Sequence, residues 1–176
     1  MPGVRDKELG DFLQILGTLG RIAGQALQDN LFPEKWSERK FQDELKKLIR
    51  ADPRIGAELE EHPRAAGGIT DLSFRGIWIE LKVESDHFVT IQDSPRLLGQ
   101  TAQYVAGSNR RFGVLCVLAY SPKTNAPGSV ANDIDLLIIP PPNSVGKLEL
   151  IVGVVIIRGN LPTPCSWSQS CKNQTN

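Results

Sequence analysis

A carboxylate and an ammonium group stand two residues apart in the stretch GGITDLSFRGIWIELKVE, residues 67–84. From Ile77 onward apolar and polar residues alternate, which is the period of a β-strand with one buried face. This period puts Glu80 and Lys82 on the same face of the strand, about 6.6 Å apart along it. Such a pair could hold a divalent cation and act on a phosphate group, or it could be an ordinary ion pair on a solvated strand surface.

A second carboxylate, Asp71, would face Glu80 if the hairpin turn is centred on Arg75 and Gly76. The Cβ atoms of such a pair lie about 5 Å apart, and two facing carboxylates repel each other unless positive charge lies between them. Mg²⁺ is the natural candidate, because it binds one or two carboxylates together with water and phosphate oxygens. We therefore predict a metal site at Asp71 and Glu80, with Lys82 beside it to orient a metal-bound water or to stabilise charge on a phosphate.

Three helices are expected from the spacing of apolar residues and from capping residues. Residues 6–28 carry apolar side chains at spacings of three and four, so we expect an amphipathic helix that packs on its own sheet or serves as a dimer arm. Ser37 can cap a second helix over residues 38–50. A third helix is expected over residues 94–107, where proline occupies the first helical position and glycine the end.

Extended segments alternate with these helices. The predicted strands lie near residues 55–61, 69–74, 77–84, 111–120, 134–142 and 147–159. The order helix, three strands, helix, strand, with extra strands behind it, predicts a single α/β domain whose mixed central sheet is flanked by helices. We divide it into an N-terminal helical extension at residues 6–36, a core at 37–158 and a polar tail at 159–176.

The hairpin motif is similar to that of a known family. GITD at residues 68–71 followed by IELK at residues 79–82 resembles the core motif of the PD-(D/E)xK nuclease superfamily, which includes restriction endonucleases, Holliday-junction resolvases and RecB-type nuclease domains. Thr70 stands where the name of the motif has proline. The resemblance covers residues 37–121 and implies a restriction-endonuclease-like αβββαβ core.

The resemblance also implies roles for individual residues. Asp71 and Glu80 would bind Mg²⁺ or Mn²⁺, and Lys82 would assist the attacking water. Members of the family often carry a further metal ligand on the first core helix, and three glutamates are candidates for it here: Glu38, which fits best, Glu44 on the same helix, and Glu61 on the strand that follows. A solvated glutamate on the helix surface is the alternative interpretation of Glu38.

Downstream of the hairpin, QTAQY contains Gln100 and Tyr104, like the Q-x-x-x-Y element of the RecB-type branch. Their i, i+4 spacing puts both on one helical face, where glutamine can bind a phosphate or a catalytic side chain and tyrosine can pack on the strand or on the DNA backbone. The arginines that flank this helix are expected to contact phosphates: Arg96, Arg110 and Arg111.

The composition limits the partners and the compartment. The net charge is zero, there is no apolar run long enough for a membrane helix, and the first residues lack the pattern of a signal peptide. We therefore expect a cytoplasmic Mg²⁺- or Mn²⁺-dependent deoxyribonuclease, an endonuclease ahead of an exonuclease, that needs a homodimer or a partner protein to assemble enough basic surface for DNA. The main alternative is a catalytically silent nuclease-fold domain that binds nucleic acid or a partner protein, and the next is a plain scaffold domain.

Overall fold

The computed structural model describes residues 6–61, 72–87, 89–98, 110–121, 123, 128–140 and 149–161. In chain order the helices and strands are α1 (Asp6–Asp29), α2 (Glu38–Arg50), β1 (Leu59–Glu61), β2 (Leu72–Phe74), β3 (Ile77–Glu84), the short α3 (Ser94–Leu97), β4 (Phe112–Ala119), β5 (Ile134–Ile139) and β6 (Leu150–Arg158). Single 3₁₀ turns lie at Gly56–Glu58, Ile91–Asp93 and Val130–Asp133.

The strands form one mixed six-stranded sheet in the order β1-β2-β3-β4-β6-β5. The first three strands are an antiparallel meander, β4 and β6 run parallel to β3, and β5 pairs with β6 in the antiparallel sense. The predicted α/β class and mixed sheet are confirmed. The strand expected from residue 55 begins only at Leu59, because Gly56 has a φ of +45° and opens a 3₁₀ turn.

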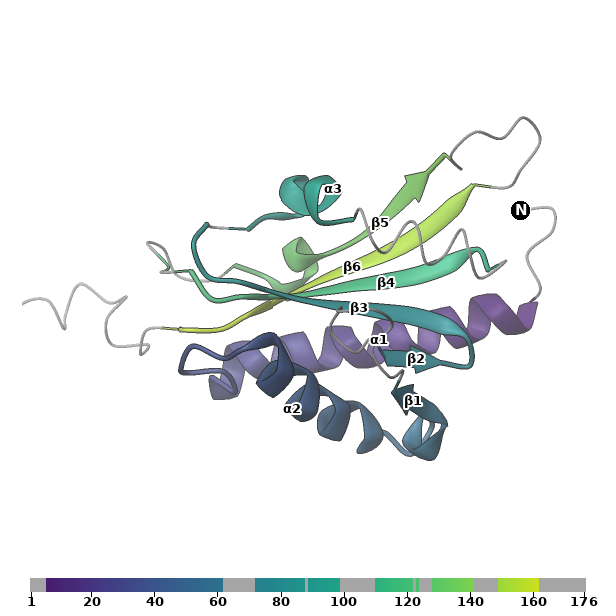
Figure 1. The fold of residues 1–176 in the computed structure, drawn as a ribbon, viewed down its shortest axis with the longest axis horizontal. Helices are drawn as coiled ribbons and strands as arrows, with labels where there is room; N and C mark the ends of the chain where they lie inside the picture. The colour runs from purple at the N-terminus through teal and green to yellow at the C-terminus, as the bar shows by residue number, and fades with distance from the viewer. Residues whose placement is uncertain are drawn as a thin grey trace, which may run out of the picture.

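Helices α1 and α2 cover one face of the sheet, and α3 lies on the opposite face (Figure 1). The buried side of α1 packs on β4 and β6, where the rings of Phe12 and Phe112 stack with centroids 4.7 Å apart. Gly153 of β6 permits this close packing, because a Cβ at that position would lie 2.8 Å from Leu16 Cδ1. Of the two expectations for this helix, packing on its own sheet is the one observed.

Helix α2 begins and packs as its sequence predicts. The Ser37 hydroxyl accepts a hydrogen bond from the Lys40 backbone N–H at 3.2 Å and so caps the first turn. Phe41, Leu45 and Ile49 recur at helical spacing and are fully buried against the sheet. Because these apolar side chains face the sheet, the rotation of α2 about its axis is fixed, and with it the set of α2 side chains that can reach the sheet.

The face of the sheet that carries α3 has its own apolar cluster. Val89 and Leu98 pack there against the side chains of β4 and β6. The helix predicted over 94–107 begins at Ser94, but residues 99–109 lie outside the described part of the chain. Among the helices of the described residues, none has the length and hydropathy that a membrane span requires.

Candidate active site

The β2–β3 hairpin fixes which residues of the candidate site lie opposite one another. Its turn consists of Arg75 and Gly76, which have φ values of +49° and +81°, and its register pairs Leu72 with Ile79 and Phe74 with Ile77. The predicted turn and the predicted pairing of these strands are confirmed. Asp71 lies outside the described residues, so its position opposite Glu80 stays a prediction.

The strained turn residue Arg75 is held by ion pairs on the outside of the hairpin. Its guanidinium binds Asp11 of α1 at 2.7 Å and the Glu58 carboxylate at 2.5 Å. The hydrogen bonds from Arg75 lower the pKa of Glu58 from its usual value. These contacts compensate for a non-glycine residue in the left-handed region and so help to fix the register of β3.

Glu80 and Lys82 form the charged centre of the candidate site. The Lys82 Nζ lies 2.9 Å from Glu80 Oε1, and the two side chains are 29% and 3% exposed respectively. Strand alternation places both on the sheet face opposite α1 and α2, level with Leu115 and Val117 of β4. A carboxylate this deeply buried needs compensating charge, and Lys82 supplies it while its own side chain stays partly open to solvent.

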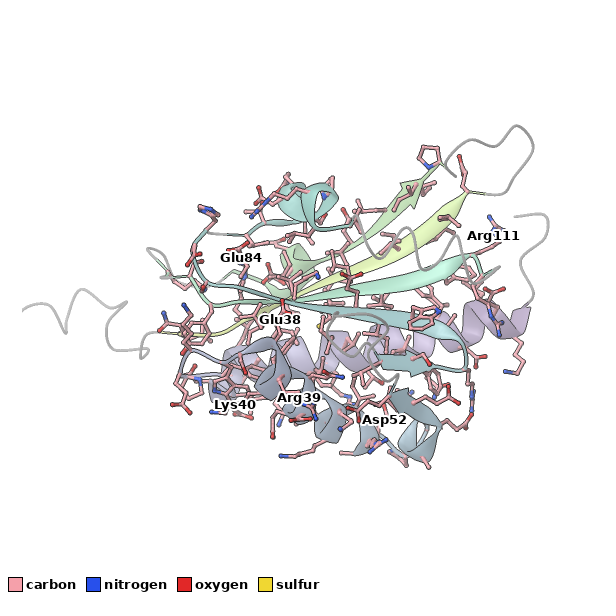
Figure 2. All side chains as sticks on the ribbon, viewed as in Figure 1. Glu38, Arg39, Lys40, Asp52, Glu84 and Arg111 are labelled. Carbon is pink, nitrogen blue, oxygen red and sulfur yellow. The ribbon has the colours of Figure 1, made fainter. Side chains whose placement is uncertain are left out.

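Glu38 reaches β3 from the first turn of α2. Its Oε1 accepts a hydrogen bond from the Val83 backbone N–H at 3.4 Å, and Figure 2 shows the residue between α2 and β3. The Val83 N–H points to the edge of β3 at which Ile77 and Ile79 pair with β2. At the level of Val83, no described strand pairs with this edge. We call this side of β3, from Glu80 to Glu84, the β3 edge. Glu38 thus lies at the β3 edge, beside the backbone of Lys82.

The two other candidates for a third acid lie elsewhere. Glu44 forms an ion pair with Lys47 at 2.9 Å on the outer surface of α2. Glu61 lies at the end of β1 and binds Lys46 at 2.7 Å. Of the three glutamates considered from the sequence, Glu38 is the one whose carboxylate contacts β3.

The arginines expected to bind phosphate do not come together. Arg96 lies on α3 at the carboxyl end of β3, where its guanidinium is 3.5 Å from Glu84. Arg110 packs over Gly76 at the other end of that strand, and the Arg111 backbone N–H donates to Glu8 at 3.1 Å. Arg111 and Glu84 are labelled at opposite ends of the sheet in Figure 2. Gln100 and Tyr104 lie outside the described residues.

The donors in place suit a hard divalent cation. The carboxylates of Glu80 and Glu38 offer oxygen ligands, which is the chemistry that Mg²⁺ and Mn²⁺ prefer. Within the described ranges no group of three His, Cys, Asp or Glu side chains is close enough to hold a metal, and the expected ligand Asp71 falls in the gap between β1 and β2. The site therefore fits such an ion only if further oxygens come from Asp71, water or substrate.

One polar residue of this region was missed from the sequence. Gln42 lies one helical turn after Glu38 and is fully buried in α2. Neither its Nε2 nor its Oε1 has a hydrogen-bond partner among the described residues. The i, i+4 spacing from Glu38 was the signal that could have indicated it.

Models of protein families, curated proteins and solved structures gave no match to the chain. Inferences about its function therefore depend on the residues and geometry of the chain itself.

Proposed function

We propose that the protein is a divalent-metal-dependent nuclease that hydrolyses phosphodiester bonds in DNA, built on a restriction-endonuclease-like core. The element order α2-β1-β2-β3-α3-β4 supports this, since it is a helix, an antiparallel meander of three strands, a helix and a strand parallel to the third. The observation that carries the proposal is the buried Glu80 beside Lys82 on β3, with Glu38 at the adjacent β3 edge.

Each residue has a specific role in this proposal. Glu80 and Glu38, together with Asp71, would hold Mg²⁺ or Mn²⁺. When bound, such an ion lowers the pKa of a coordinated water and neutralises charge on the phosphate. The Lys82 ammonium, anchored by Glu80 and partly exposed, can donate a hydrogen bond to the attacking water or to a phosphate oxygen. Attack of the water on phosphorus breaks one P–O ester bond and gives a phosphomonoester and a hydroxyl.

The charge distribution supports the expected need for additional basic surface. The chain has zero net charge, and several basic side chains of the described regions already bind acids of the same molecule. Arg96 remains 46% exposed at the carboxyl end of β3, although it contacts Glu84. A homodimer or a partner protein would add the cations that a DNA backbone requires.

The test is a comparison of wild type, Lys82→Ala and a matched lysine variant. Wild type is incubated with linear, circular, single-stranded and branched DNA in Mg²⁺ or Mn²⁺, and opening of circular DNA identifies an endonuclease. We expect Lys82→Ala to lose at least about 100-fold in cleavage rate, the usual contribution of a group that assists proton transfer. Lys47→Ala, which removes an exposed lysine from the pair with Glu44, should cleave as wild type does.

The outcomes separate the proposal from its rivals. Full activity of Lys82→Ala would refute the proposed mechanism, because the cleavage chemistry would then not depend on Lys82. If wild type binds DNA but cleaves none of the substrates, the catalytically silent alternative is correct. If it neither binds nor cleaves, the scaffold alternative gains support.

A further inference from the structure

Several side chains of the described residues bury a polar atom without a hydrogen-bond partner, and Gln42 is the one among them in which both polar atoms lack a partner. Its relative exposure is 0%, and neither atom of its carboxamide has a hydrogen-bond partner in the described part of the chain. A buried amide without partners destabilises a protein, because it gives up hydrogen bonds to water and gains none. Such a group needs an explanation, and a ligand that completes its hydrogen bonds provides one.

The contacts of neighbouring α2 residues show which residue of β3 lies alongside Gln42. We call this position along the strand its level. Going back from the end of the helix in steps of four residues, an Arg50 Nη atom donates to the backbone O of Leu59 at 3.1 Å and Lys46 binds Glu61 at 2.7 Å. Two turns before Lys46, the Glu38 carboxylate meets the N–H of Val83. Gln42 lies midway between Lys46 and Glu38 in this series.

The strand register converts these contacts into positions on β3. Leu59 pairs with Phe74 and thus lies level with Ile77, while Glu61 pairs with Leu72 and lies level with Ile79. Arg50, Lys46 and Glu38 are therefore at the levels of residues 77, 79 and 83. Gln42 takes the remaining level, that of Leu81, which lies between Glu80 and Lys82. The spacings agree, because four helical residues rise about 6 Å and two strand residues about 6.6 Å.

The direction of Gln42 follows from the same series. Each step of four residues turns the side-chain direction by about 40° around the helix axis. Along α2 the side chains therefore point first to β3, which Glu38 contacts, and later to β1, which Lys46 contacts. This series directs the Gln42 side chain between these strands from the α2 side of the sheet, toward the β3 edge at the level of Glu80 and Lys82. The side chains of those two residues leave β3 on the opposite face. No described residue of β1 or β2 lies at this level.

We propose that Gln42 is a positioning residue of the candidate site, whose carboxamide binds a water in the coordination shell of a divalent cation held by Glu80 and Glu38. The inference rests on the proposed function. The carbonyl oxygen of Gln42 would accept a hydrogen bond from such a water, and its N–H groups would donate to a carboxylate or phosphate oxygen. Mg²⁺ suits this arrangement because it keeps several of its waters when it binds to proteins.

The test uses Gln42→Met, which keeps the length of the side chain and removes the amide. In the metal-free protein the melting temperature should rise by about 4 °C, because an unpaired buried polar group has been removed. The affinity for Mg²⁺ alone, measured by calorimetry, should fall at least about tenfold, as is usual when a residue that supports metal ligands is lost. Gln25→Met on the exposed surface of α1 is the matched control and should change neither quantity.

Gln42→Glu retains an acceptor oxygen and should keep an affinity for Mg²⁺ within a few-fold of wild type, which makes it the second test variant. The inference is overturned if Gln42→Met binds Mg²⁺ as tightly as wild type, or if both variants melt below wild type without metal. It fails alone if wild type binds Mg²⁺ and cleaves DNA while Gln42→Met does both equally well. The proposed function fails with it if wild type binds no Mg²⁺ and cleaves nothing.

Discussion

Removing the charge of Lys82 should destabilise the protein more than removing the charge of Glu80. In Lys82→Met the Glu80 carboxylate, only 3% exposed, loses the ammonium 2.9 Å away at a place where bulk water has little access. In Glu80→Gln the ammonium is left, but its side chain is 29% exposed and can be hydrated. The asymmetry follows because the cost of breaking a pair depends on how deeply the remaining charge is buried.

The magnitudes follow from this geometry. An exposed ion pair contributes about 0.2–1 kcal/mol, and breaking a fully buried ion pair costs about 3–5 kcal/mol. Because Lys82 is partly exposed, we expect Lys82→Met to lower the free energy of unfolding by about 2–3 kcal/mol and Glu80→Gln by about 1 kcal/mol. The double variant should lose less than the sum of the two, with a coupling of about 1 kcal/mol or more.

The assay is urea unfolding at pH 7, followed by tryptophan fluorescence, for wild type, both single variants and the double variant. The exposed pair Lys47 and Glu44, at a similar 2.9 Å, provides the same cycle on the surface and should give a coupling of about 0.3–0.5 kcal/mol. If the two cycles give equal couplings, or if Glu80→Gln is the more destabilising change, then Glu80 is not the buried charge that the site requires.

Three further predictions concern residues outside the site. Asp52 accepts hydrogen bonds from Arg54 and Thr18, which hold the pKa of its carboxyl well below the usual value. Its carboxylate therefore stabilises the fold at pH values above the unfolded-state pKa of about 3.9. This stabilisation is lost as the pH falls toward the lower pKa of the folded state. Asp52→Asn should therefore lower the melting temperature at pH 7 and have a smaller effect at pH 3; an equal effect at both would contradict this. Gly153→Ala should lower the free energy of unfolding by about 1–3 kcal/mol, because its Cβ would lie 2.8 Å from Leu16 Cδ1. Gly17→Ala, exposed on α1 with no atom near its Cβ, should instead be neutral or stabilising by up to about 1 kcal/mol in the same urea titration.

The hairpin could be predicted because its information is local. Alternation from Ile77 assigns the two faces of β3, and a two-residue turn at Arg75 and Gly76 leaves one register for β2. Helix α2 was equally clear, since Ser37 marks its start and the apolar positions define its buried side. These signals depend only on residues near one another in the chain.

The separation of the arginines could not be read from their nearness in sequence. Arg96 follows β3 and therefore lies near its carboxyl end. Since β4 is parallel to β3, the chain must return to the starting end of β3 before β4 begins, and this return places Arg110 against Gly76 of the hairpin turn. Residues that flank one predicted helix thus lie at opposite ends of the sheet, so they do not form one phosphate-binding surface.

The position of Gln42 depends on a relation between two elements that neither sequence segment contains alone. Helix α2 runs antiparallel to β3, and its four-residue steps match the two-residue steps of the strand closely enough to stay aligned from Arg50 to Glu38. Sliding α2 by one turn would move Glu38 to the level of Leu81 and leave Gln42 level with Ile79, away from Lys82. The ion pair of Lys46 with Glu61 opposes that slide, so this contact with the end of β1 helps to hold Glu38 and Gln42 level with Val83 and Leu81 of the β3 edge.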